Sequence, residues 1–128
     1  MKPHIVKNKF KIRNKNNELN IVPFDVIHGL IKATGFVFNK VAYISDCNAI
    51  PKKSMKHLYN LNVLVLDCLK ISKHPSHFSL DEALDLIKIV KPKKTILTNL
   101  HTDLDYHSLK KELPTNIIPA YDGINFNF

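Results

Sequence analysis

The chain has 128 residues, of which 45% are hydrophobic, and 19 Lys and Arg residues against 11 Asp and Glu give it a formal net charge of +8. This length and apolar content suit one folded domain and exclude a disordered chain. No stretch approaches the roughly 20 apolar residues of a membrane span, no apolar leader follows Met1, and two cysteines are too few for a disulfide framework. We therefore expect a cytoplasmic protein without a membrane partner.

Residues 1–18 are polar and basic and predict an irregular lead-in or an edge strand. The densest basic stretch, Lys7–Lys15, lies here, and only Arg13 among all the basic residues of the chain is arginine. Proteins that read phosphates and bases use arginine for bidentate contacts. We expect a solvated basic surface and no nucleic-acid partner. Nucleic-acid binding remains a testable alternative, because its affinity would fall steeply with salt.

The next part of the chain favours strands. Residues 19–26 are typical of a strand ending near His28, and residues 35–38 and 41–44 predict a hairpin around Asn39–Lys40. Pro51 then suits the first turn of a short helix that reaches about Leu58.

The second half alternates strands and helices. Residues 62–67 form an apolar run typical of a buried strand. Ser79 and Glu82 fit a capping box ahead of a helix over 80–90 with an apolar stripe. We expect a strand at 95–98 and a helix at 106–113, then two strands at 117–121 and 124–128 around a turn at Asp122–Gly123. This order predicts an α/β domain.

Three of these strands end beside a residue that can bind a metal: His28, Asp46 and His101. Functional sites in layered α/β folds tend to lie where strands end. Imidazole and carboxylate suit zinc, iron or manganese in a hydrolytic site. Each residue alone has an ordinary structural explanation, such as a loop cap for Asp46. The coincidence of three predicts a candidate metal site.

Around these residues the sequence resembles the C-terminal half of the metallo-β-lactamase superfamily, in particular the branch of the phosphoribosyl 1,2-cyclic phosphate phosphodiesterase. The likeness runs in order through residues 19–128. Its segments are Val22–Gly29, Gly35–Phe38, Val41–Asp46, Leu64–Asp67, His74–Leu84, Leu97–Tyr106 and Pro119–Ile124.

The resemblance implies a role for each site residue. His28, Asp46 and His101 would be the metal ligands, with Asp46 bridging two ions, although some relatives place the last histidine at the position of Asn99. His77 would be an active-site histidine that acts with Asp46 in catalysis and assists the leaving group or the phosphate. The alternative for His77 is a loop histidine hydrogen-bonded near the helix cap.

Two further acidic residues, Asp67 and Asp103, lie where they can orient the imidazoles of such a site, as carboxylates near metal ligands do.

The best-known motif of the superfamily, His-x-His-x-Asp-His, is absent, and residues 1–18 are too short to replace the sheet that carries it. We expect residues 1–128 to be one partial domain, the C-terminal half of a four-layer αββα sandwich, with a mixed sheet and helices on one face. Such a half would leave an apolar sheet face uncovered.

The resemblance implies two zinc or manganese ions in the complete fold, acting on a small phosphodiester or cyclic phosphate substrate. The isolated chain has too few ligands, so we expect weak metal binding or none and little activity. The missing half would come from a separate chain or from self-association. The alternative function is a non-catalytic module that dimerises or binds a partner through its uncovered sheet.

Overall fold

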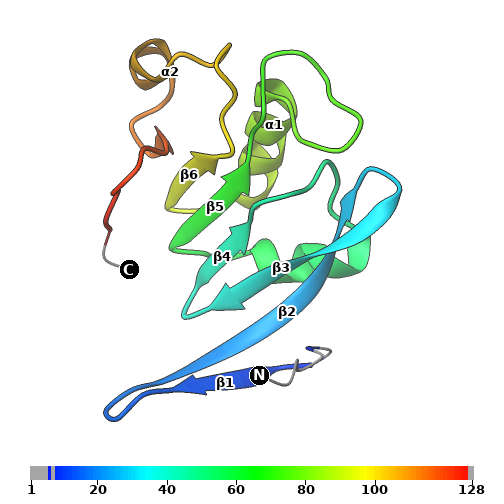
Figure 1. Cartoon of the computed structure of the whole chain (residues 1–128), viewed down its shortest axis with the longest axis vertical. Helices are drawn as coiled ribbons and strands as arrows, with labels where there is room; N and C mark the ends of the chain where they lie inside the picture. Colours follow the sequence, from blue (N-terminus) through cyan, green and yellow to red (C-terminus); the bar gives the residue numbers. More distant parts are fainter. Residues whose placement is uncertain (1–5, 7, 127–128) are drawn as a thin grey trace.

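A computed structural model of the chain describes residue 6 and residues 8–126 (Figure 1). Seven strands form one sheet in which every strand lies beside its neighbours in the sequence. The strands are β1 (Phe10–Arg13), β2 (Glu18–His28), β3 (Ile31–Phe38), β4 (Val41–Ile44), β5 (Val63–Asp67), β6 (Lys94–Thr98) and β7 (Ile117–Pro119). The first four pair antiparallel and the last four pair parallel, so the sheet is mixed, as predicted.

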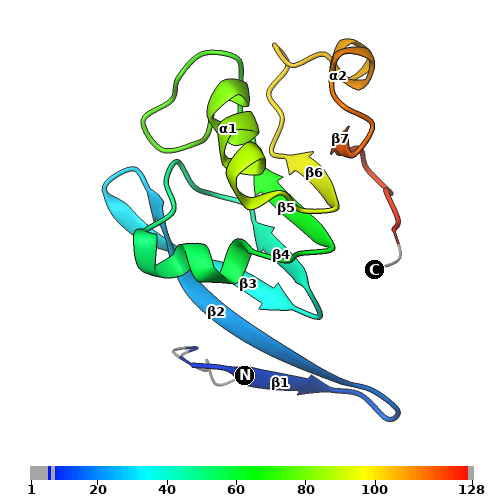
Figure 2. The same cartoon turned by 180° about the vertical axis from the view of Figure 1, so that it is seen from behind.

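Three helical segments make the crossovers between the parallel strands. The 3₁₀ helix η1 (Lys52–Leu58) follows β4, α1 (Leu80–Val90) follows β5, and α2 (Tyr106–Glu112) follows β6. Figure 2 shows η1 and α1 lying across the same face of the sheet, and α2 lies near its β6–β7 end. The α/β class and the position of η1 and α1 on one face agree with the prediction.

The capping box of α1 is confirmed. The side chain of Ser79 accepts a hydrogen bond from the backbone N–H of Glu82, and the carboxylate of Glu82 accepts one from the backbone N–H of Ser79 at 3.0 Å. The helix ends at Val90. The N–H of Lys91, its C-cap, donates to the carbonyl of Ile87 at 2.8 Å, and the left-handed φ of 49° at Lys91 turns the chain out of the helix. The buried side chains of the helix, which fix it on the sheet, are Ala83, Leu86, Ile87 and Val90.

The predicted hairpin of β3 and β4 is also confirmed. Asn39 and Lys40 have φ angles of 44° and 62°, and two consecutive positive values are typical of the tight turn that matches the twist of a hairpin. However, β3 begins at Ile31, four residues before the predicted start. The turn at Gly29, with a φ of 62°, reverses the chain at once and lets β3 pair with the whole second half of β2.

Two predicted elements need correction. The segment after Pro51 forms a 3₁₀ helix that begins at Lys52, and Pro51 precedes it in extended conformation. The strand predicted at 124–128 is absent from residues 124–126, and residues 127–128 lie outside the described part of the chain. The last described residues pack side chains against the sheet and do not pair with a strand.

The polar lead-in contains an edge strand, the second of the two predicted alternatives. β1 pairs antiparallel with the first four residues of β2, from Phe10 opposite Ile21 to Arg13 opposite Glu18. Residues 1–5 of the lead-in and Lys7, the first residue of the predicted basic stretch, lie outside the described residues. Within the described residues, no helix is long and apolar enough to cross a membrane.

The two faces of the sheet are covered differently. The main core lies between the sheet and its helices, where Val26, Leu64 and Leu97 are completely buried. On the opposite face a second cluster of Val41, Val63, Val65 and Ile96 is buried too. The face expected to be bare is therefore covered in part by the chain itself, through the residues Phe38, Ala120, Ile124 and Phe126. An apolar cavity of about 240 Å³ remains there.

Candidate metal centre

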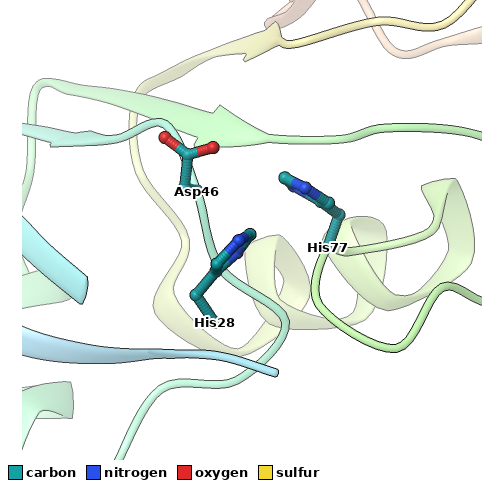
Figure 3. A group of neighbouring side chains, drawn as sticks. All are labelled: His28, Asp46 and His77. Carbon is teal, nitrogen blue, oxygen red and sulfur yellow. The ribbon is translucent and has the colours of Figure 1, made fainter. Parts of the chain in front are cut away.

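Three side chains that can bind a metal meet at one edge of the sheet (Figure 3). His28 is the last residue of β2, Asp46 follows β4 by two residues, and His77 lies in the loop between β5 and α1. One ligand atom of each side chain lies within 4.8 Å of those of the other two. The rings of His28 and His77 meet edge to face, with centroids 4.6 Å apart. The structure therefore brings together two predicted metal ligands and the predicted catalytic histidine.

The position of His28 depends on the turn that follows it. Gly29 has a left-handed φ of 62°, and a Cβ at this position would lie 3.2 Å from the Cβ of Ser76. The Asn48 side chain holds the turn in place, because its Oδ1 accepts the Gly29 N–H at 2.9 Å and its Nδ2 donates to the carbonyl of Pro75 at 3.1 Å. One amide thus joins the end of β2 to the loop that carries His77.

The Nδ1 atom of His28 is buried and has no hydrogen-bond partner among the described residues. A buried polar atom without a partner costs free energy, so native proteins satisfy such atoms with a protein group, a water molecule or an ion. Two imidazoles and a carboxylate are also the donor set that zinc and manganese accept. The residues present therefore fit a divalent cation.

Asp67 lies completely buried behind the three side chains, at the end of β5. Its Oδ2 accepts the backbone N–H of Cys47 at 3.0 Å and lies 2.8 Å from Nδ1 of His77. Its Oδ1 accepts a hydrogen bond from the side-chain amide of Asn99 at 3.0 Å. Because a carboxylate only accepts hydrogen bonds, His77 must carry its proton on Nδ1, which leaves Nε2 for the metal or the substrate.

Backbone hydrogen bonds bring His77 to this place. The N–H of Phe78 donates to the carbonyl of Cys47, and the N–H of Leu69 donates to the carbonyl of Phe78, both at 2.9 Å. These bonds fold the loop after β5 back over the end of β4. His77 consequently contacts Asp67, whereas the helix cap at Ser79 is occupied by Glu82. The catalytic role of His77 remains a prediction.

The two thiols near the site are not members of the group of three. Cys47 and Cys68 are completely buried. Burial, with the charge of Asp67 adding to it, raises the pKa of both thiols, that of Cys68 to about 12. A buried, protonated thiol is a poor nucleophile, so neither residue is expected to react with electrophiles.

The third predicted ligand, His101, is not a member of the group of three. Its side chain is 57% exposed, and its Nδ1 lies 3.0 Å from a carboxylate oxygen of Asp103, the acid expected to orient it. The other candidate for that position, Asn99, turns its amide to Asp67 and lies 3.3 Å from Nδ1 of His77. The role of His101 as a ligand remains a prediction.

A cavity of about 420 Å³ lies next to Asn99, between residues 98–100 and the turn at residues 120–124. Asn99, whose side-chain nitrogen lies 3.3 Å from Nδ1 of His77, connects this cavity to the group of three, although none of the three side chains lines it.

Sequence reasoning named Asp67 as a carboxylate that can orient an imidazole of the site, but it did not single out Asn48. The signal for Asp67 was an acid at the end of a run of apolar residues, because a charge in such a position must be paired inside the protein. No local signal marked Asn48, whose partners lie 19 and 27 residues away.

Known proteins resemble the chain in sequence and in structure. The family model described as the beta-lactamase superfamily domain matches residues 2–99, which include His28, Asp46 and His77 but not His101. The solved structure of a new diphosphatase from the PhnP family is 33% identical, has a TM-score of 0.89, and is matched over 98% of this chain and 48% of that chain.

Two further matches are more distant. The octanoyltransferase of Porphyromonas gingivalis is 27% identical over 109 residues, which are 84% of this chain and 22% of that protein. The short form of human tRNase Z is 16% identical with a TM-score of 0.65, over 91% of this chain and 46% of that chain, and shows likeness of fold alone. The chain thus spans about half the length of these solved chains and about a fifth of the curated relative.

Proposed function

The chain belongs to the metallo-β-lactamase superfamily, and on this premise we propose that it supplies part of a metal-dependent hydrolase acting on phosphodiester or cyclic phosphate substrates. The observation that carries the proposal is the meeting of His28, Asp46 and His77 within 4.8 Å, in front of the buried Asp67. The similarity to a diphosphatase supports a substrate that contains phosphate.

Each side chain has a distinct task in this proposal. His28 and Asp46 would hold the cation, with His101 as the expected third ligand. A bound divalent cation would polarise a phosphoryl oxygen and lower the pKa of water at the site. His77, protonated on both ring nitrogens, would donate the proton on Nε2 to the leaving oxygen of the substrate. Asp67 stabilises the protonated imidazole through Nδ1.

The remaining ligands, in this proposal, come from polypeptide that is not part of this sequence. The matched portion of the diphosphatase is 48% of its length, and its other portion has no counterpart here. Two ions, the number that the resemblance implies, need more protein donors than His28, Asp46 and His101 offer. The chain alone is therefore expected to bind zinc or manganese weakly and to hydrolyse substrate slowly.

Zinc titration by calorimetry tests the site. We expect affinity to fall by about tenfold or more in His28→Ala and in Asp46→Ala, since each loses a ligand. His107→Ala, which removes an exposed imidazole outside the group, should bind zinc as the unmodified chain does. Unchanged affinity in both ligand variants would refute the metal centre.

Hydrolysis of bis(4-nitrophenyl) phosphate tests the reaction. We expect activity with manganese or zinc to rise when the unmatched half of the diphosphatase chain is added, and to disappear in Asp46→Ala and His77→Ala. Activity that does not need Asp46 would contradict the proposal. A stable oligomer that binds no metal, seen by analytical ultracentrifugation, would favour the non-catalytic module instead.

A further inference from the structure

A second cavity, of about 500 Å³, lies between α2, β7 and the C-terminal segment. We call it the α2 cavity and define it by Lys94, Tyr106, Lys110, Lys111 and Tyr121, which line it together with apolar residues of β6, β7 and the last described turn. Its volume falls within the range of about 300–1,000 Å³ that is usual for small-molecule sites. No residue of the candidate metal centre lines it, so it needs an explanation of its own.

The charged residues that line the α2 cavity have one sign. Lys94 comes from β6, and Lys110 and Lys111 come from the last turn of α2. No Asp or Glu is among the lining residues, and none of the three lysines takes part in the ion pairs found within the described part of the chain. Positive charges gathered at a low-dielectric wall raise the local concentration of anions.

The rest of the lining is mostly apolar and aromatic, with Thr115 and Asn125 as its uncharged polar residues. Ile96, Ile117 and Phe126 line the cavity from the sheet and from the C-terminal segment. The rings of Tyr106 and Tyr121 stand edge to face, with centroids 5.9 Å apart and an interplanar angle of 84°. An arrangement of this kind offers a rigid surface to an apolar group. A ligand that filled the α2 cavity would therefore bury an apolar body here.

The lysines lie close to this apolar surface. Nζ of Lys110 lies 5.8 Å from the centroid of the Tyr106 ring, at the distance of a cation–π contact. Lys94 is two residues before Ile96 on β6, and both line the cavity because alternate residues of a strand face the same side. One ligand can thus contact the apolar wall and the ammonium groups at the same time.

We propose that the α2 cavity binds an amphiphilic anion, a small molecule with one apolar body and one carboxylate or phosphate head group. The apolar body lies against Ile96 and the tyrosine rings, and the head group lies at Lys110 and Lys111. This site shares no residue with the proposed hydrolytic centre. A highly charged polymer would leave the apolar wall unused, so the combination of features favours a small molecule.

Calorimetry with the full chain in EDTA tests the proposal, because EDTA removes any contribution from the metal centre. Decanoate and decyl phosphate are the probes, and their relative affinities identify which head group is preferred. Decanol has the apolar body without the anionic head group, and inorganic phosphate has the anionic head group without the apolar body. Each should bind at least about tenfold more weakly than the better amphiphile, a difference of about 1.4 kcal/mol in binding free energy. Equal binding of decanol, or no binding of either amphiphile below its micelle concentration, would overturn the proposal.

Matched variants locate the binding. Lys110→Gln combined with Lys111→Gln should weaken decanoate or decyl phosphate binding by about tenfold or more. Lys52→Gln combined with Lys56→Gln removes the same charge from exposed positions on η1 and should leave binding unchanged. An equal loss of affinity in the two double variants would show a general effect of net charge and refute the site. Methyl NMR shifts confined to Ile96 and Ile117 on addition of the probe would support it, whereas shifts spread over the sheet would contradict it.

Discussion

The carboxylate of Asp67 and the imidazole of His77 form a pair, with Oδ2 of Asp67 2.8 Å from Nδ1 of His77, although ten positions separate the two residues in the sequence. The aspartate is completely buried, and the histidine side chain is 16% exposed. The buried carboxylate therefore holds Nδ1 of His77, and Nε2 faces the site.

Replacing Asp67 with Asn should release this control over His77. The amide can donate to the ring as well as accept, so the preference for a proton on Nδ1 should disappear. ¹⁵N NMR of the imidazoles measures the tautomer directly. Asp103→Asn is the matched control, since its contact is with His101 and the tautomer of His77 should not change. Persistence of the Nδ1–H form in Asp67→Asn would show that another group orients the ring.

Replacing Gly29 with Ala should destabilise the protein more than the same change at Gly123. Both glycines have positive φ, so each substitution costs roughly 1–2 kcal/mol of backbone strain. Only at Gly29 does the new Cβ also meet a neighbour, Ser76, at 3.2 Å, whereas nothing lies within 4 Å at Gly123. Urea unfolding measures both costs. Equal losses would mean that the Ser76 loop moves freely away from the turn.

Lys40→Gly should stabilise the β3–β4 hairpin. Lys40 holds a φ of 62°, which glycine adopts without strain and which follows asparagine in the preferred turn. We expect a gain of up to about 1 kcal/mol in the free energy of unfolding. Lys56→Gly, an exposed position inside η1, should instead lower it, because glycine weakens a helical segment. A loss at position 40 would mean that the lysine side chain makes a contribution greater than the strain.

The free energy of unfolding should decrease as the pH rises above about 9. Burial raises the pKa of Cys68 from 9.0 to about 12, so above pH 9 the unfolded chain releases a proton that the folded chain retains. The folded state then binds more protons, and stability falls with pH across the interval between these two values. Urea unfolding at several pH values should show a shallower fall in Cys68→Ala. Identical slopes would contradict a buried, protonated thiol.

Local patterns predicted the regular elements well where one pattern dominated. The Ser79–Glu82 capping box and the apolar run at 62–67 were sufficient to place α1 and β5. Predictions were wrong where contacts between residues distant in the sequence determine the local structure. Residues 124–126 belong to a segment with the composition of a strand, but Ile124 and Phe126 pack against the second apolar cluster of the sheet and pair with no strand. β3 begins early because it pairs with β2 along its length, and a short segment of sequence taken alone does not reveal this pairing.

The site was predictable as far as strand ends specify it. His28 and Asp46 meet because β2 and β4 run in the same direction and end at the same edge. The position of His77 depends on bonds between the β5–α1 loop and Cys47, so only its chemistry was visible in advance. The place of Asn99 beside Asp67 depends on a φ of 63°, which the residue type permits but does not require.

The order of the strands has a consequence for how the chain can acquire its structure. Because each strand pairs with the strands before and after it in the sequence, the sheet can grow from β1 to β7 as the polypeptide leaves the ribosome, and no strand has to wait for a distant partner. Within the described residues, the sheet has no gap between neighbouring strands into which a strand of another polypeptide would have to insert. Whatever completes the proposed metal centre can therefore dock against a sheet that has already formed, without being threaded into it.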